Sequence, residues 1–363
     1  MSILRLVRPE LLKIQPYSSG NYSKTLRLHA NELPWSALEN SIHLNFYPEK
    51  DLQDQLQKQL AQCYQVDGDQ LMLTRGSDDG IDLVTRLFLN PGQDACMQFS
   101  PTFSMYSFYV SLQQAQLIEC PLNSLNNFQL RSGDIRRHWQ NKCKVIFLCN
   151  PNNPTGNLFG LDFIAMLCEE YKNRSVIVVD EAYIEFAEAQ SATCLIPQFD
   201  NLIVLRTLSK AYGLANLRLG IILSQAHIIN TLNKIIGPYP LSNVVLDLAL
   251  RAIEQSDWFS QSLKTIKGLR TCLIKELQQC TLIEKVYPSQ TNFVLVKTQY
   301  AKELFSWLAD QGIAIKSFSS NSSLQDHLRI TVGSALQNEL LIRAVAAFQN
   351  NVSGKQNAKN LIY

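Results

Sequence analysis

Hydrophobic and polar positions follow two different patterns along the chain. From about residue 50 to residue 235, short apolar runs rich in β-branched residues alternate with stretches of helical periodicity. Continuous apolar runs are typical of strands buried on both faces, in a largely parallel sheet covered by helices. The predicted strands cover residues 70–75, 94–100, 116–122, 143–149, 175–180, 201–207 and 218–224, and the clearest predicted helices cover residues 78–89 and 160–173.

After residue 237 the pattern changes to a long helical stretch followed by shorter elements. The stretch covers about residues 243–280, and we interpret it as a connector between domains. Strands at 292–298, 314–318 and 327–333 and helices at 301–311 and from 335 predict a smaller α+β unit. We therefore expect an α/β protein with a large domain at residues 45–236. The small domain would comprise residues 1–44 and 237–363 and include an N-terminal arm.

Composition narrows the class of protein. The 363 residues are 46% hydrophobic and 18% charged, which suits a globular chain of two domains. The net charge of +2 gives no reason to expect binding to nucleic acid or to a membrane surface, and no apolar run is long enough to span a bilayer. Nine single cysteines without a CxxC pair predict reduced thiols and a cytoplasmic location. The histidines lack the spacing of a metal site, so we expect no metal.

Two polar motifs follow the first and fourth predicted strands. In "TRGSDDGID", Gly76 permits a tight turn, and Ser77 and Asp78 can open a helix whose N-terminus could hold a phosphate. Ordinary helix capping is the alternative. In "NPNNPTG", the side-chain amide of Asn153 could donate to a ligand oxygen, although the motif also fits an ordinary irregular loop.

Two further motifs follow the fifth and sixth predicted strands. "VIVVDEAYIEF" delivers Asp180 and Tyr183 to a strand end, where a buried carboxylate needs a cationic partner such as a protonated pyridine nitrogen. A surface acidic turn is the alternative. In "RTLSKAYGLANLRLG", Lys210 could form a Schiff base and Arg218 could bind a phosphate, whereas a solvated pair of cations is the usual meaning of this spacing.

Together the four motifs supply the groups that pyridoxal 5'-phosphate needs. These are a Schiff-base lysine, a carboxylate at the ring nitrogen, donors to the ring oxygen and a phosphate site. In this order the motifs resemble the fold-type I aminotransferases of the aspartate aminotransferase superfamily and, more narrowly, the histidinol-phosphate aminotransferases. The narrower resemblance also rests on "HANELP", "FYPEKD", "SPTFSMY", "PYPLS" and "LRITVG", which are spread over nearly the whole chain.

The resemblance implies the PLP-dependent transferase fold type I and assigns roles around the cofactor. Lys210 would form the Schiff base and move the proton during catalysis, and Asp180 would keep the ring nitrogen protonated. Tyr183 and Asn153 would bind the ring oxygen, and Phe103 would stack on the ring where relatives often have tyrosine. The cofactor phosphate would be held by Ser77, Asp78, Thr207, Ser209 and Arg218.

The resemblance also implies a homodimer and a substrate site. Tyr47 would cross to the partner's cofactor phosphate and, like Asn153, contact the substrate. Arg329 would bind the substrate carboxylate. Lys316, where relatives commonly have arginine, and Tyr17 are candidates for binding the substrate phosphate.

The implied reaction interconverts histidinol phosphate and 2-oxoglutarate with imidazole-acetol phosphate and glutamate, in histidine biosynthesis. The alternatives within the same fold are a threonine-phosphate decarboxylase and an aromatic or broad-specificity aminotransferase. A non-catalytic effector-binding domain of the same fold is a further alternative, which the presence of Lys210 disfavours.

Overall fold

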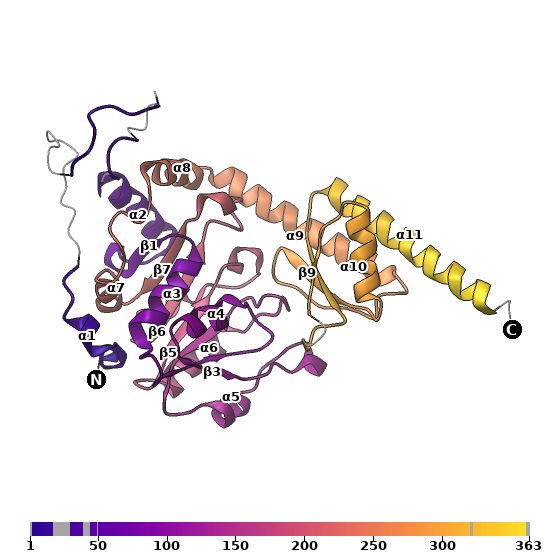
Figure 1. Cartoon of the computed structure of the whole chain (residues 1–363), viewed down its shortest axis with the longest axis horizontal. Helices are drawn as coiled ribbons and strands as arrows, with labels where there is room; N and C mark the ends of the chain where they lie inside the picture. Colours follow the sequence, from indigo (N-terminus) through magenta and orange to yellow (C-terminus); the bar gives the residue numbers. More distant parts are fainter. Residues whose placement is uncertain (1, 17–29, 39–43, 49, 320–321, 361–363) are drawn as a thin grey trace.

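A computed structural model gives the structure of residues 2–16, 30–38, 44–48, 50–319 and 322–360. Its larger part is built on a seven-stranded sheet in the order β1-β7-β6-β5-β4-β2-β3 (Figure 1). All its strands run in one direction except β7, which is antiparallel to β1 and β6. The strands are β1 (Leu71–Thr74), β2 (Ala95–Gln98), β3 (Gln116–Glu119), β4 (Cys143–Cys149), β5 (Val176–Asp180), β6 (Leu202–Thr207) and β7 (Gly220–Ser224). The seven predicted strands are confirmed.

Helices cover both faces of this sheet because its central strands are apolar on both sides. Every residue of β5, β6 and β7 is buried. One apolar cluster packs the sheet against α2 (Lys50–Tyr64), α5 (Ser132–His138), α6 (Leu161–Glu170) and α8 (Asn243–Ile253). A second cluster lies on the other face, against α3 (Ser77–Phe88), α4 (Met105–Leu112) and α7 (Ala226–Leu232). The result is the three-layer α/β arrangement that the sequence predicts.

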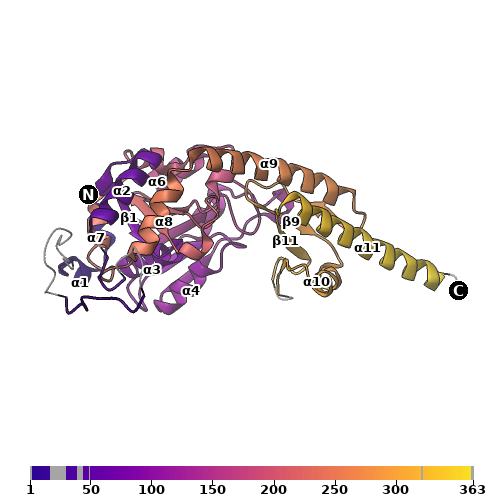
Figure 2. The same cartoon turned by 90° about the horizontal axis from the view of Figure 1, so that it is seen from above.

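The smaller part is an antiparallel sheet of four strands in the order β10-β11-β9-β8. Its strands are β8 (Lys285–Val286), β9 (Phe293–Lys297), β10 (Lys316–Ser317) and β11 (His327–Thr331). It packs in its own apolar cluster with α9 (Ser256–Gln279), α10 (Ala301–Asp310) and α11 (Ala335–Asn360). Figure 2 shows α9 running from the large part to the small one, with α11 extending to the C-terminal end of the molecule.

The predicted connector at 243–280 differs in detail from the observed structure. It consists of two helices, α8 and α9, interrupted at Glu254 and Gln255. The first helix buries Leu246 and Leu250 in the large part, whereas the second buries Leu273 and Leu277 in the small part. The chain changes direction between α8 and α9 because the two helices pack on different cores.

The beginning of the chain also differs from the expected grouping. Ile3, Leu6 and Val7 are buried in the core cluster of the seven-stranded sheet, and the backbone N–H of Ile3 donates to Oδ2 of Asp200 over 2.8 Å. These side chains recur at helical spacing, so one short turn buries all of them. Residues 3–7 therefore belong to the large part, contrary to the expectation that residues 1–44 accompany the small domain. α1 (Pro9–Leu12) follows directly.

The sheet brings several strand ends to one edge. β1, β4, β5 and β6 all end there, and the antiparallel β7 begins there, with Gly220 paired to both Thr74 and Thr207. Segments following residues 74, 149, 180 and 207 are thus neighbours, together with the segment that precedes residue 220. Within the described part of the chain, no helix combines the length and apolar character needed to cross a membrane.

Candidate active site

A pocket lies at this shared edge of the large sheet. Ten of its twelve lining residues are ones predicted from the sequence, and Cys149 and Ala182 are additions. The predicted ones are Ser77, Asp78, Phe103, Asn153, Asp180, Tyr183, Thr207, Ser209, Lys210 and Arg218. The four polar motifs therefore converge as expected from the topology of the sheet.

Asp180 lies at the floor of the pocket, as the last residue of β5. It is 2% exposed, and its two oxygens accept hydrogen bonds from neutral donors. The Tyr106 hydroxyl donates to Oδ2 over 2.7 Å, and the Ala182 N–H donates to Oδ1 over 3.1 Å. Burial raises the pKa of Asp180 to about 6, although both hydrogen bonds oppose this rise. Among the residues that the structure describes, no lysine or arginine forms a salt bridge with Asp180.

Tyr183 and Asn153 form one wall of the pocket. The Asn153 amide lies 3.5 Å from the Tyr183 hydroxyl, and its oxygen accepts a hydrogen bond from Arg329 of β11. The small sheet thus contributes a guanidinium to the edge of the pocket. Phe293 at the start of β9 supports this wall, since its ring packs edge-on against Tyr183 at 5.2 Å and lies under the Arg329 guanidinium.

Lys210 stands beside this wall, just beyond the end of β6. Its Nζ lies 5.7 Å from the centre of the Tyr183 ring. Burial by the surrounding protein lowers the pKa of Lys210, and the positive charges of Arg329 and Arg218 lower it further. A lysine whose pKa is lowered carries a larger fraction of neutral amine, which is the nucleophilic form.

The opposite end of the pocket can hold an anion. α3 begins at Ser77, directly after Gly76, whose φ of 81° is strained for residues with a side chain. A Cβ on Gly76 would lie 2.5 Å from a terminal nitrogen of Arg218, and a Cβ on Gly220 would lie 2.2 Å from the Gly76 backbone. Two glycines therefore allow the helix N-terminus, the start of β7 and the arginine to lie close together. Arg218 also forms a 3.3 Å ion pair with Asp78.

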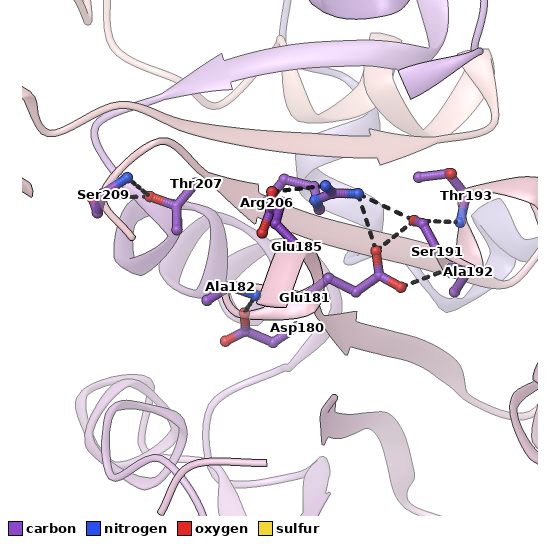
Figure 3. Close-up of polar contacts among 10 residues, drawn as sticks. All are labelled: Asp180, Glu181, Ala182, Glu185, Ser191, Ala192, Thr193, Arg206, Thr207 and Ser209. Atoms are coloured by element: carbon purple, nitrogen blue, oxygen red, sulfur yellow. Dashed lines mark hydrogen bonds and ion pairs between the residues drawn. The ribbon is translucent and has the colours of Figure 1, made fainter. Parts of the chain in front are cut away.

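The turn after β6 completes this end of the pocket. The backbone N–H of Ser209 donates to Oγ1 of Thr207 over 3.1 Å, and the two side-chain hydroxyls lie 2.9 Å apart (Figure 3). Both residues line the pocket together with Lys210. A helix N-terminus, two hydroxyls and a guanidinium together match the donor set of a phosphate site.

The opposite face of the same strand ends carries a buried ion network (Figure 3). Arg206 precedes Thr207 and contacts Glu181 and Glu185 at 3.3 and 2.8 Å. Ser191 donates to Glu181, and the Arg206 guanidinium also stacks on the Tyr64 ring at 4.6 Å. Because successive strand residues point to opposite faces, Thr207 reaches the pocket while Arg206 ties β5 and β6 together from behind.

Among the residues that the structure describes, three predicted site residues, Arg329, Lys316 and Tyr47, do not line the pocket. Arg329 reaches it through Asn153, as described above. Lys316 of β10 is exposed and lies opposite Arg329 in the strand register, so the two cations project from the same face of the small sheet. Tyr47 is 48% exposed and stacks on Tyr239 at 4.6 Å. Tyr17 lies outside the described residues.

The sequence did not single out Tyr106, Cys149 or Arg206. Tyr106 lies three residues after Phe103, one helical turn further along the same motif, and this spacing was the available signal. Arg206 lies next to Thr207 in the motif that contains Lys210, but its carboxylate partners are more than twenty residues away in the chain.

Comparison with known proteins places this geometry in a family. The sequence model of the protein family aminotransferase class I and II matches residues 18–348. The histidinol-phosphate aminotransferase 1 of Legionella pneumophila (strain Lens) is 56% identical over 364 aligned positions, covering all of both chains. The chain belongs to the class I and II aminotransferases and, within them, to the histidinol-phosphate aminotransferases.

Solved structures agree on the fold. The histidinol-phosphate aminotransferase of Clostridium acetobutylicum superposes with a TM-score of 0.77 at 21% identity, covering 85% of this chain and 92% of that one. The Sinorhizobium meliloti histidinol-phosphate aminotransferase, solved in complex with pyridoxal 5'-phosphate, gives 0.77 at 23% identity, covering 85% and 83%. The fold is that of the fold-type I aminotransferases.

Proposed function

We propose that this aminotransferase interconverts histidinol phosphate and 2-oxoglutarate with imidazole-acetol phosphate and glutamate, using pyridoxal 5'-phosphate held in the pocket described above. The observation that carries the proposal is the meeting of Lys210, Asp180 and Arg218 in one pocket. The 56% identity to a histidinol-phosphate aminotransferase over the full chain supports the substrate.

The residues present fit the cofactor. Asp180 is a buried carboxylate with neutral donors only, so a protonated ring nitrogen would supply the cation that it lacks. The α3 N-terminus, Ser209 and Arg218 fit the phosphate, and the Gly76 turn leaves room for it. When bound, pyridoxal phosphate supplies an aldehyde that takes up an amino group and a ring that withdraws electrons.

Each side chain then has a distinct part in catalysis. Lys210 would hold the cofactor through Nζ and would be the base that takes the proton from the substrate α-carbon. Asp180 would hold the proton at the ring nitrogen. Tyr183 and Asn153 would orient the ring oxygen, and Phe103 would cover one face of the ring.

Substrate recognition would use cations of the small sheet. Arg329 would bind the carboxylate that glutamate presents, since a guanidinium pairs with a carboxylate through two parallel hydrogen bonds. Lys316 shares the face of Arg329 and would attract the phosphate of histidinol phosphate. Tyr17 stays a candidate for the same phosphate.

We also propose a homodimer in which Tyr47 reaches the partner's cofactor and substrate. Described residues of the N-terminal segment expose large apolar side chains, namely Leu33, Trp35, Leu38, Leu44 and Tyr47. Apolar surface of this kind marks an interface. Co-expressing Lys210→Ala and Tyr47→Ala chains tests it: a mixed dimer contains one site with both residues intact, so activity should return. If the mixture were no more active than either parent, Tyr47 would not act across the interface.

A cytoplasmic site of action is part of the proposal. The nine cysteines are all unpaired, and those at 96, 120, 143, 149 and 168 are buried. Free thiols are kept in reducing compartments.

The reaction is tested by single half-reactions of the enzyme loaded with pyridoxal phosphate. Histidinol phosphate and glutamate should each shift the cofactor absorption, and the products should be imidazole-acetol phosphate and 2-oxoglutarate. If phenylalanine converted the cofactor and histidinol phosphate did not, the protein would instead be an aromatic or broad-specificity aminotransferase. Release of carbon dioxide from threonine phosphate would indicate a decarboxylase.

A further inference from the structure

Tyr106 is a buried tyrosine whose hydroxyl reaches Asp180 at the floor of the pocket. Its side chain is 0% exposed, and its hydroxyl donates to Oδ2 of Asp180 over 2.7 Å. The two residues are 74 positions apart in sequence and come from α4 and β5. Tyr106 does not line the pocket, so it contacts a bound molecule only through its neighbours.

The ring of Tyr106 is held on two sides. It stacks on Phe147 of β4 at 4.7 Å with the planes 3° apart, and it meets the edge of Phe103 at 5.7 Å. Stacked and edge-on aromatic contacts of this kind fix the orientation of a ring. The ring is therefore held in the orientation in which its hydroxyl donates to Asp180.

The surroundings of Asp180 explain why this donor matters. Besides Tyr106, the titratable groups around Asp180 are Cys149, Asp78, Tyr183 and Lys210. Burial raises the pKa of Asp180 and Asp78 raises it further, whereas the Tyr106 hydrogen bond lowers it more than the charge of Lys210 does. Burial also holds the pKa of Tyr106 well above its usual value, so its hydroxyl stays protonated and acts as a donor.

We propose that Tyr106 is a positioning residue that keeps Asp180 ionised and aimed at the ring nitrogen of the cofactor. The Tyr106 hydroxyl and the Ala182 N–H hold one oxygen each, so the carboxylate cannot rotate away from the pocket. This inference rests on the proposed function, since it needs a ring nitrogen at that place. It adds a residue outside the pocket to the machinery that binds the cofactor.

The test measures ligand binding to the protein freed of cofactor. Tyr106→Phe keeps the ring and removes the hydroxyl. Tyr171→Phe is the matched control, because Tyr171 is 1% exposed and its hydroxyl has no hydrogen-bond partner among the described residues. The probes are pyridoxal 5'-phosphate and its 1-deaza analogue, in which a carbon–hydrogen group replaces the ring nitrogen.

The expected result is a loss of binding affinity that occurs mainly for the ligand with a ring nitrogen. Tyr106→Phe should weaken binding of pyridoxal phosphate about tenfold to a hundredfold, the range for a lost hydrogen bond to a charged group, and change the affinity for the deaza analogue much less. Tyr171→Phe should change neither affinity appreciably. Equal weakening of both ligands by Tyr106→Phe, or weakening of neither, would overturn the inference. A wild-type protein that binds neither ligand would overturn the proposed function itself.

A second variant keeps the test decisive if Tyr106→Phe does not fold. Replacing Tyr106 by 3-fluorotyrosine preserves the ring and the hydroxyl but makes the hydroxyl a stronger donor. The pH at which binding of pyridoxal phosphate weakens on acidification should then move down, because Asp180 stays ionised to lower pH. An unchanged or higher midpoint would contradict the inference.

Discussion

Asp180 and Glu181 are adjacent carboxylates, almost equally buried at 2% and 1% exposure, yet they face opposite sides of the sheet. Glu181 lies 3.3 Å from the Arg206 guanidinium, so a cation balances its charge. Asp180 accepts hydrogen bonds from the Tyr106 hydroxyl and the Ala182 N–H, which are neutral. On the pocket face, the carboxylate of Asp180 has neutral hydrogen-bond donors. On the opposite face, here called the rear face, the carboxylate of Glu181 has a cationic partner.

The difference teaches which of the two carboxylates is available to a ligand. A buried charge without a cation is costly to the folded chain, and such costs gather at functional sites. Burial raises the pKa of both carboxyl groups, but only Glu181 has an arginine that opposes the rise. We infer that Glu181, paired with Arg206 on the rear face, stabilises the folded chain. Asp180, on the pocket face, lowers the stability of the cofactor-free protein and is available to bind a cationic group of a ligand.

The largest expected effect belongs to the pocket face. Lys210→Ala should lower transamination about 10⁴-fold, since it removes both the amine and the base, while the free energy of unfolding of the cofactor-free protein should change little. Activity assays and urea titrations measure both. Lys302→Ala, at an exposed position of α10, is the control. Retention of more than a tenth of the activity would break the assignment of Lys210.

A substitution in the ion network of the rear face should mainly lower the free energy of unfolding. Arg206→Met should lower the free energy of unfolding by about 3–5 kcal/mol, because two buried carboxylates lose their cation. With Arg206 gone, the already raised pKa of Glu181 rises further, so part of the loss should return as the pH falls from 7.5 to 5.5.

Arg136→Met is the matched control for this change. Arg136 pairs with Glu170 at the surface, and 64% of its side chain is exposed. Arg136→Met should therefore lower the free energy of unfolding by less than about 1 kcal/mol. Equal losses for the two arginine variants in urea titrations would contradict a structural role for the rear network.

A smaller effect is expected at the rim of the pocket. Arg329→Lys keeps the charge but loses the planar fork, so KM for glutamate should rise about tenfold with a smaller change in kcat. Steady-state kinetics separate the two quantities. Arg343→Lys, on the exposed side of α11, should change neither. A change in kcat alone would mean that Arg329 serves the chemistry rather than substrate binding.

Much of the fold could be predicted from the sequence because its strands are continuous apolar runs. The break between α8 and α9 could not, since Glu254 and Gln255 are ordinary helix residues and the interruption comes from packing on two separate cores. Likewise Ile3 and Leu6 carry an apolar pattern, but nothing local tells which core they join.

The site was predictable to the extent that it consists of strand ends. Motifs after residues 74, 149, 180 and 207 had to meet once the sheet was parallel. The functions of neighbouring polar residues were not predictable, because they depend on partners distant in sequence. The contacts of Asp180 with Tyr106 and of Glu181 with Arg206 show this, since each joins separate elements.

The free energy of unfolding of the cofactor-free protein, measured for Asp180→Asn and Glu181→Gln, tests the contrast between the two faces most directly. Because the folded-state pKa of Asp180 is about 6, the wild-type protein loses stability as the pH rises from about 4 to 6. At pH 7.5, Asp180→Asn should therefore stabilise the protein by about 2 kcal/mol, a gain that shrinks at pH 4.5. Glu181→Gln should destabilise it by about 3 kcal/mol. Destabilisation of similar size by both variants at pH 7.5 would contradict the division of roles between the two faces.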